Sequence, residues 1–141
     1  MIRQLLIYTL SVIALTMSGQ SRFYTSEKLS SNQITQIYQD SEGYIWIGTE
    51  YGLNKYDGYR FTNYFHEESN PNSISSNIIS YLFQDSSGTL WIGTQTGLDR
   101  YNPADNQFVS VEMKGATSVP RINAIVQEDD NHLLVGTAGY G

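Results

Sequence analysis

The chain repeats itself at a spacing of 45 residues, and this repeat constrains its fold more than any other feature. When Asn32–Tyr56 is aligned with Asn77–Tyr101, thirteen of the 25 positions are identical. The shared positions include an Asp-Ser-x-Gly turn and the tetrapeptide Trp-Ile-Gly-Thr. Self-similarity of this kind indicates a fold built from copies of one supersecondary unit.

A third, diverged copy begins near the end of the chain. A shift of 43 residues aligns residues 79–94 with residues 122–137, and it keeps Gln127, Gly136 and Thr137 while Leu134 replaces the tryptophan. The turn of this copy reads Asp-Asp-Asn in place of Ser-x-Gly. We therefore expect two complete units and the start of a third.

Each complete copy predicts four short β-strands. The predicted strands are rich in β-branched and aromatic residues and are separated by Gly, Asp, Asn and Ser, as is typical of antiparallel strands. Some of these runs also fit one face of a helix, but their length of about six residues favours strands. The expected strands are residues 34–39, 44–49, 53–56 and 59–64, and then 79–84, 89–94, 98–101 and 107–111. Asp57-Gly58 predicts a type I′ hairpin turn.

A four-stranded antiparallel unit with apolar residues on both faces must stack on further copies to bury them. This requirement predicts an all-β fold made of β-propeller blades. Trp46 and Trp91 recur with the repeat, so we expect both to fill the wedge between neighbouring blades rather than to bind a ligand. The glycine two positions later is expected to let backbones approach one another closely near the central channel.

The first residues predict a secretory signal peptide. Arg3 precedes Leu5–Met17, thirteen mostly apolar residues without a charge, and small and polar residues 18–21 follow. Thirteen residues are too few to span a bilayer, which needs about 20. A buried core helix is the alternative. We expect export, with residues 1–20 as the signal peptide and cleavage between Ser18 and Ser21.

Composition and motifs exclude several function classes for this chain. Eight basic and 14 acidic residues give a net charge of -6 without a basic cluster, which argues against nucleic-acid binding. There is no cysteine. His66 and His132 stand apart from any second ligand or base, and adjacent acidic pairs point to opposite faces of an extended chain. We expect no catalytic residue, no cofactor and no metal site here.

The repeated pattern carries a family resemblance. Residues 29–56 and 74–101 both read Ser-Ser-Asn-x-Ile and then Gln-Asp-Ser-x-Gly-x-Ile/Leu-Trp-Ile-Gly-Thr-x-x-Gly-Leu-x-Lys/Arg-Tyr. This pattern resembles the two-component regulator propeller repeat. The resemblance implies the periplasmic sensor region of a hybrid two-component histidine kinase that senses glycan-derived oligosaccharides and signals to transcription. It also implies a homodimeric parent held in the membrane by a downstream helix.

Two other function classes remain open. One is a secreted propeller enzyme, a glycan lyase or hydrolase, with its catalytic residues elsewhere. The other is a binding propeller without a signalling module. Kinase motifs are absent from this chain, so kinase activity would belong to downstream domains of the parent.

The repeat also predicts the domain organisation. Residues 29–73 form the first blade, residues 74–118 the second, and residues 119–141 the start of a third. Residues 21–28 resemble the segment that precedes the second copy, so we expect residues 22–26 to be a ring-closing outer strand that completes the final blade of the ring.

One edge of the predicted sheets offers candidate ligand-binding residues. The segment 65–73 is long and polar, and long loops on rigid scaffolds often carry binding. In a propeller this link lies on the same rim as the turn that follows Trp-Ile-Gly-Thr. The candidates are Glu50, Tyr51, Gln95 and Thr96, with Tyr51 as a stacking platform for a sugar ring.

Overall fold

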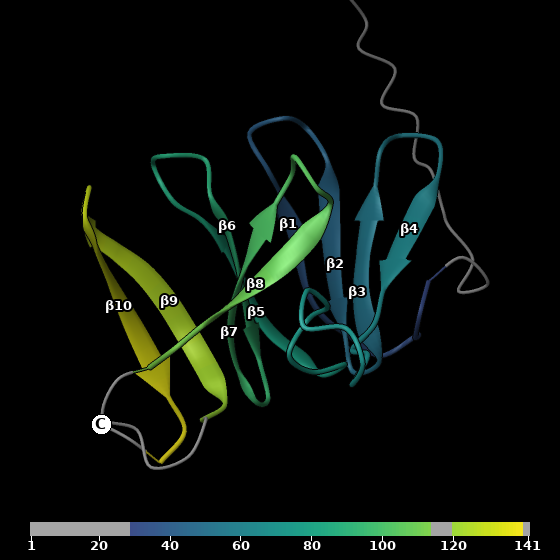
Figure 1. Cartoon of the computed structure of the whole chain (residues 1–141). Helices are drawn as coiled ribbons and strands as arrows, with labels where there is room; N and C mark the ends of the chain where they lie inside the picture. The colour runs from purple at the N-terminus through teal and green to yellow at the C-terminus, as the bar shows by residue number, and fades with distance from the viewer. Residues whose placement is uncertain (1–28, 114–119, 140–141) are drawn as a thin grey trace, which may run out of the picture.

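Three antiparallel β-sheets make up the described part of the chain (Figure 1). The structure is a computed structural model that describes residues 29–113 and 120–139. The first sheet contains β1 (Ile34–Gln39), β2 (Ile45–Thr49), β3 (Gly52–Tyr56) and β4 (Phe61–Tyr64). The second contains β5 (Ile79–Gln84), β6 (Leu90–Thr94), β7 (Gly97–Asn102) and β8 (Gln107–Val111). The third pairs β9 (Ile122–Asp129) with β10 (His132–Thr137).

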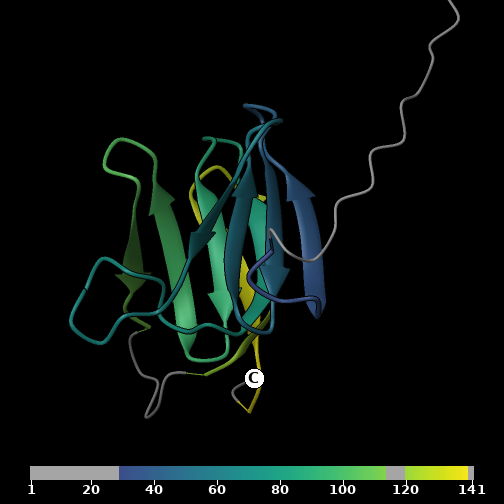
Figure 2. The same ribbon diagram turned by 90° about the vertical axis from the view of Figure 1, so that its right-hand side faces the viewer.

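The strands follow the chain in the order that the repeat predicts. In the two four-stranded sheets each strand pairs with the next one in sequence. The registers are equivalent: Ile47 lies opposite Asn54 in the first sheet, and Ile92 lies opposite Asp99 in the second. Figure 2 shows the sheets side by side. The expected all-β propeller-blade architecture is confirmed.

Two sequence-based predictions lie outside the described residues. These are the signal peptide at residues 1–20 and the ring-closing strand at residues 22–26. Within residues 29–113 and 120–139, no helix is long and apolar enough to cross a membrane.

The sheets stack through their first strands. β5 packs against β1 and β2, and β9 packs against β5 and β6. One face of the first sheet therefore packs against β5 of the second sheet, and one face of the second sheet packs against β9 of the third. This arrangement buries the apolar face that each sheet cannot cover by itself.

The core between the first two sheets is fully formed. Trp46 is completely buried, and its ring meets Tyr101 of the second sheet edge-on with centroids 4.8 Å apart. The indole nitrogen donates a 2.7 Å hydrogen bond to Asp40 in the preceding turn. The remaining buried members of this core are Leu53, Ile74, Ile79, Leu82, Leu90, Ile92 and Phe108. Trp46 fills the wedge as the sequence predicted.

Trp91 holds the equivalent place in the second sheet but is only partly buried. Its indole nitrogen donates a 2.8 Å hydrogen bond to Asp85, which repeats the contact of Trp46 with Asp40. Trp91 packs against a smaller core formed by Leu98, Ile122 and Ile125. The described third sheet consists of β9 and β10, so no third-strand tyrosine covers Trp91 as Tyr101 covers Trp46.

The glycine of Trp-Ile-Gly-Thr makes room for a side chain of the next sheet. A methyl group built on Gly48 would lie 2.7 Å from Cγ2 of Ile79, and one built on Gly93 would lie 2.8 Å from Cβ of Ile122. Both distances are too short for a real contact. The close approach that the repeat predicts is therefore between a glycine and an isoleucine rather than between two backbones.

The Asp57-Gly58 turn differs from its prediction. Gly58 has a positive φ of 96°, but Asp57 does not, so the turn is not type I′. Instead the Asp57 side chain accepts hydrogen bonds from the backbone N–H groups of Tyr59 and Arg60, at 2.8 and 2.7 Å. These bonds stabilise a four-residue connection between β3 and β4.

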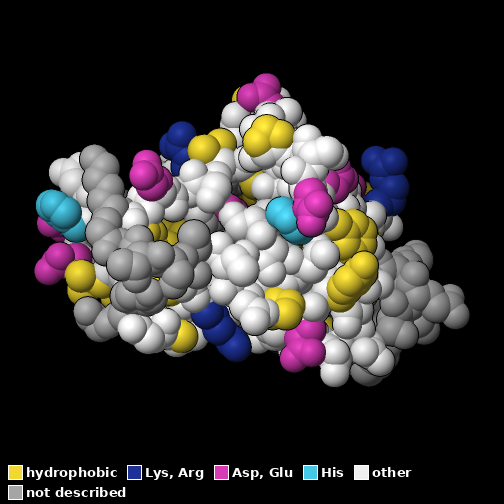
Figure 3. Space-filling view, turned by 60° about the horizontal axis from the view of Figure 1, so that its bottom comes forward, with side chains coloured by type: hydrophobic (Ala, Val, Ile, Leu, Met, Phe, Trp, Pro, Cys, Tyr) yellow, Lys and Arg dark blue, Asp and Glu magenta, His cyan; other side chains and the backbone are white. Residues whose placement is uncertain are grey.

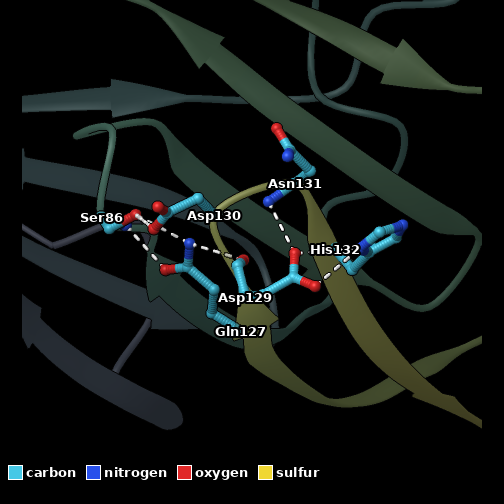
Figure 4. Close-up of polar contacts among 6 residues, drawn as sticks. All are labelled: Ser86, Gln127, Asp129, Asp130, Asn131 and His132. Atoms are coloured by element: carbon cyan, nitrogen blue, oxygen red, sulfur yellow. Dashed lines mark hydrogen bonds and ion pairs between the residues drawn. The ribbon is translucent and has the colours of Figure 1, made fainter.

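A recurring side-chain bond ties each turn to the next sheet. Gln84 accepts a 2.8 Å hydrogen bond from the backbone N–H of Ser41, and Gln127 accepts an equal bond from Ser86. Figure 4 shows the second of these contacts beside the turn in which His132 pairs with Asp129. The equivalent glutamines of the second and third copies are thus inter-sheet contacts.

Candidate functional site

The four candidate residues lie in two equivalent turns at one edge of the stacked sheets, here called the rim. Glu50 and Tyr51 join β2 to β3, and Gln95 and Thr96 join β6 to β7. All four side chains are exposed. Figure 3 looks toward this edge, where acidic, hydrophobic and polar side chains are interspersed. The structure therefore puts both turns on the same edge, as the repeat requires.

Each rim turn is held by a buried threonine. Thr49 accepts a 3.0 Å hydrogen bond from the N–H of Tyr51 and donates a 2.8 Å bond to the carbonyl of Gly52. Thr94 makes the same two contacts with Thr96 and Gly97, at 3.2 and 3.0 Å. The backbone of both turns is therefore fixed without any help from the exposed side chains.

Tyr51 lies against the start of the long loop. Its ring centroid is 5.7 Å from that of Phe65, with 52° between the planes. Tyr51 is 59% exposed and Phe65 is 38% exposed, although both are large aromatic residues. The two rings form an exposed aromatic surface, here called the Tyr51–Phe65 pair. Sequence reasoning singled out Tyr51 but not Phe65, because their contact joins the turn between β2 and β3 to the segment that follows β4.

The loop that follows Phe65 is well anchored. The Nδ1 of His66 donates a 2.8 Å hydrogen bond to the carbonyl of Ile74, and the backbone N–H of His66 donates to Oδ1 of Asn77 at 2.7 Å. Ser73 accepts from the N–H of Glu67 at 3.0 Å. The N–H of Phe108 donates to the carbonyl of Asn72 at 2.9 Å, which attaches the loop to β8. The loop that follows the Tyr51–Phe65 pair is therefore fixed by hydrogen bonds to its own blade and to β8.

The two rim turns remain separate groups. Thr96 donates its hydroxyl to the carbonyl of Ser75 at 3.0 Å, so it is engaged within its own sheet. Among the described residues, no hydrogen bond or ring contact joins Glu50 or Tyr51 to Gln95 or Thr96. Tyr51 lies beside Phe65, with Glu50 next to it in the same turn, whereas Gln95 and Thr96 form a second polar group on the neighbouring sheet.

A cavity of about 270 Å³ lies between the first two sheets at the edge opposite the rim, and sequence reasoning did not anticipate it. Its walls include Tyr44, Lys55 and Tyr101. The ammonium group of Lys55 lies 3.8 Å from the centre of the Tyr44 ring, a cation–π contact. The sequence feature that could have indicated this contact is the basic residue before the tyrosine in both copies, Lys55-Tyr56 and Arg100-Tyr101. The ammonium group also donates a 3.4 Å hydrogen bond to the hydroxyl of Tyr101 in the second sheet. Because Lys55 joins the two sheets in this way, we interpret the cavity as a feature of inter-sheet packing.

Asp99 is a buried carboxylate close to the rim. It is 0% exposed and accepts hydrogen bonds from the N–H and hydroxyl of Ser75. Burial raises the pKa of Asp99 above its ordinary value, and the bonds from Ser75 oppose that rise. The equivalent residue in the first sheet is Asn54, which accepts from Ser30 and donates to the carbonyl of Ile47. Asp99 therefore occupies the position that a structural amide holds in the first sheet. Among the described residues, no second titratable side chain forms a hydrogen bond with it.

No metal-binding group stands out in the part of the chain that the structure describes. Within residues 29–113 and 120–139, no three His, Cys, Asp or Glu side chains gather in a way that suits a metal ion. His66 contacts backbone and amide groups, and His132 contacts Asp129 of its own turn at 2.8 Å. The arrangement at the rim suits recognition by stacking and hydrogen bonding.

Comparison with known proteins agrees with the repeat. The family model described as two component regulator propeller matches residues 28–51 and 73–96. A protein named histidine kinase P4 from Formosa agariphila is 34% identical over 70 residues, which cover 45% of this chain and 5% of that protein. The chain thus spans a small part of this relative.

Solved structures share the same fold. The extracellular domain of the hybrid two-component system BT3049 from B. thetaiotaomicron is 29% identical and superposes with a TM-score of 0.70. That match covers 82% of this chain and 17% of the other. The extracellular domain of BT4673 from the same organism is 20% identical with a TM-score of 0.64, over 77% of this chain and 15% of the other; this second likeness concerns the fold alone. Residues 28–51 and 73–96 are therefore two copies of the two-component regulator propeller repeat, stacked as consecutive propeller blades.

Proposed function

We propose that this chain is the N-terminal part of the periplasmic sensor propeller of a hybrid two-component histidine kinase. In this proposal the rim binds an oligosaccharide released from a complex glycan, and the bound state is signalled to transcription through downstream domains. The stacked blades supply a rigid scaffold, and the parent protein supplies the membrane helix, the kinase and the dimer contact.

The observation that carries the proposal is the combination of blade geometry and relatives. The solved neighbours are extracellular domains of two-component systems, and the curated relative is named a histidine kinase. The apolar run at residues 5–17 supports export. A periplasmic location follows for a chain whose blades precede a membrane-anchored kinase.

The chemistry of the rim favours a sugar. A pyranose ring has apolar C–H faces that pack on aromatic rings, and its hydroxyl groups bond to carboxylate and amide side chains. The Tyr51–Phe65 pair offers the aromatic surface. Glu50 directly precedes Tyr51 on the same turn, and Gln95 adds an amide on the next blade. The net charge of -6 disfavours polyanionic ligands.

A test of the ligand uses the natural gene with single substitutions. Tyr51→Ala removes half of the aromatic pair, and Tyr59→Ala is the matched control because Tyr59 is 87% exposed in the turn at the opposite edge. Cells are given oligosaccharides from partly hydrolysed glycans, and transcripts of glycan-degrading genes are counted. We expect Tyr51→Ala to lower the response at least tenfold and Tyr59→Ala to leave it unchanged. An unchanged response in both would contradict binding at this rim.

A second test separates the sensor from its rivals. The reading frame beyond codon 141 should encode a transmembrane helix followed by a phosphoacceptor histidine motif. A secreted protein without either would instead favour a propeller enzyme or a binding propeller without a signalling module.

A further inference from the structure

A small polar pocket lies between the outer strands of the two complete blades. Its volume is about 150 Å³. One wall is the loop that links β4 to β5, and the other is the turn before β8 with the first residues of β8. Both walls belong to the two complete blades and the link between them. The shape of the pocket therefore does not depend on a further blade.

The pocket is built where the two copies of the repeat differ. The segment between β4 and β5 is longer than the one between β8 and β9. The chain that joins Tyr101 to its cross-strand partner Phe108 is longer than the one that joins Tyr56 to Phe61. Insertions in repeat proteins form loops that often make up the binding face. These two insertions are not needed for stacking, which the positions shared by both copies already supply.

The loop wall has a fixed backbone and free side chains. The carbonyl of Asn72 accepts a 2.9 Å hydrogen bond from the N–H of Phe108, and the N–H of Asn72 donates a 3.0 Å bond to Oδ1 of Asn70. The N–H of Asn70 donates to the carbonyl of Glu67 at 3.0 Å. The side-chain amide of Asn72, Nδ2 of Asn70 and the carboxylate of Glu67 form no hydrogen bond with another described residue. Three polar groups therefore line the pocket without an internal partner.

Asn106 presents a fourth polar group from the opposite wall. It has a positive φ of 55°, which asparagine tolerates better than most residues. Its Oδ1 accepts hydrogen bonds from the hydroxyls of Tyr64 and Tyr101, at 2.6 and 2.7 Å. These bonds fix the amide, and its Nδ2 has no hydrogen-bond partner among the described residues. The two N–H groups of Nδ2 are therefore available to a ligand.

The chemistry of the walls suits a neutral ligand that is rich in hydroxyl groups. The three amides donate hydrogen bonds and Glu67 accepts them, while Phe65 and Phe108 supply apolar surface. No Lys or Arg is among the described residues that line the pocket, so no cation there would balance an acidic ligand. Pockets for drug-sized molecules begin at roughly 300 Å³. This smaller pocket suits a single sugar ring rather than a chain of them.

We propose that the pocket binds one neutral monosaccharide unit, with Glu67, Asn72 and Asn106 as its hydrogen-bonding residues. Phe65 lines the pocket and also belongs to the Tyr51–Phe65 pair, so the two surfaces are continuous at that ring. This assignment rests on the proposed function, since the pocket takes one unit of the oligosaccharide whose neighbouring unit packs on the pair. The pocket thereby selects for a neutral unit at that position.

The experiment measures the binding of free sugars to this chain. ¹⁵N-labelled chain is titrated separately with D-glucose, D-galactose, D-mannose, L-arabinose, D-xylose and D-glucuronate, and the side-chain amide signals of Asn72 and Asn106 are followed by NMR. Asn72→Ala removes an amide that has no internal bond and keeps the backbone N–H and carbonyl that anchor the loop. Asn131→Ala is the matched control, because Asn131 is exposed in the turn between β9 and β10 and its side chain forms no hydrogen bond with another described residue.

At least one neutral sugar should shift the amide signals of Asn72 and Asn106 in a saturable manner, and glucuronate should bind more weakly. Asn131→Ala should match the wild type. Asn72→Ala should weaken binding, read from the Asn106 signal, by about fivefold, which is the effect of one lost hydrogen bond. Unshifted signals with all the neutral sugars, or equal affinity of Asn72→Ala and the wild type, would overturn the proposal.

Failure of the pocket and failure of the rim give different results. A cellular response that Tyr51→Ala lowers, together with unshifted pocket signals, would reject the pocket and keep the sugar-binding rim. Saturable shifts of the pocket signals, together with an unchanged response in Tyr51→Ala, would reject the rim and leave the pocket as the sugar site.

Discussion

The side chain of Gln36 in the first blade forms hydrogen bonds with both the backbone N–H and the backbone carbonyl of Leu82 in the second blade. Its Oε1 accepts a 2.7 Å hydrogen bond from the N–H of Leu82, and its Nε2 donates a 3.1 Å bond to the carbonyl of Leu82. Leu82 lies on β5, an edge strand whose outer N–H and C=O groups have no strand partner. A side chain thus takes the place of a neighbouring strand.

Gln36→Ala should therefore destabilise the stack. It leaves two backbone groups of Leu82 without their partners, which costs about 1 to 3 kcal/mol. Urea unfolding followed by circular dichroism measures the change. Gln33→Ala is the control, because Gln33 is exposed on the segment just before β1. Equal stabilities for both variants would show that the bond to Leu82 contributes nothing.

The two tryptophans should differ in their contribution to stability. Trp46→Ala removes a completely buried ring and should lower the free energy of unfolding by about 3 to 5 kcal/mol. Trp91→Ala should cost less in this chain, because Trp91 is partly exposed and packs on a smaller core. In a complete propeller we expect Trp91→Ala to reach the same range. Tyr51→Ala should change stability by less than about 0.5 kcal/mol. Small effects from both tryptophans would contradict the blade assignment.

The repeat allowed the strands and their stacking to be predicted, because a sheet with apolar residues on both faces needs neighbouring copies of the same unit to bury them. It did not predict the bond from Gln36 to Leu82, since position 36 is a tyrosine in the second copy. The Asp57-Gly58 turn was wrongly assigned because the Asp57 side chain supplies the hydrogen bonds of a different turn. Local residue types alone do not distinguish these alternatives.

The candidate site was predictable only in part. The two rim turns follow from the repeat, so Glu50, Tyr51, Gln95 and Thr96 were located on one edge. The Tyr51–Phe65 pair and the Lys55 cavity depend on contacts between strands or between sheets, which have no signature within a single segment. The engagement of Thr96 with Ser75 likewise arises from tertiary packing.

The pKa of Asp99 gives the stability of the chain a distinct pH dependence. Because burial raises this pKa above 3.8, the folded chain binds more protons than the unfolded chain between 3.8 and the raised value. The contribution of Asp99 to the free energy of unfolding therefore falls as the pH rises through that window. At neutral pH the buried charge opposes folding.

Asp99→Asn should remove this dependence. By analogy with Asn54, the new amide can accept from the N–H of Ser75 and donate to the carbonyl of Ile92, so stability at pH 7 should rise by about 1 kcal/mol. Unfolding by urea is compared with the wild type from acid to neutral pH. Asp105→Asn, at an exposed turn, is the control and should preserve the wild-type difference. A lower stability of Asp99→Asn at pH 7 would show that the carboxylate is favourable where it lies.

If the chain is exported, its N-terminus should be shortened by removal of the signal peptide. Protein recovered from the periplasm of a native-like host should begin between Ser18 and Ser21, because the apolar run at residues 5–17 directs secretion and small residues follow it. Mass spectrometry of the intact protein measures the new terminus. An intact Met1 in the cytosolic fraction would show that the segment is not a signal peptide.

Residue-resolved hydrogen exchange tests the stacking of the repeats most directly. The amide of Leu82 is bonded to Gln36 and covered by the first blade, whereas the equivalent residue Ile37 is 61% exposed. In dilute, monomeric chain the Leu82 amide should exchange at least tenfold more slowly than that of Ile37, and residues 22–26 should exchange rapidly beside protected Ile45–Thr49. Equal, strong protection of Ile37, Leu82 and residues 22–26 in a monomer would show that the chain closes on itself, contrary to an open stack of propeller blades.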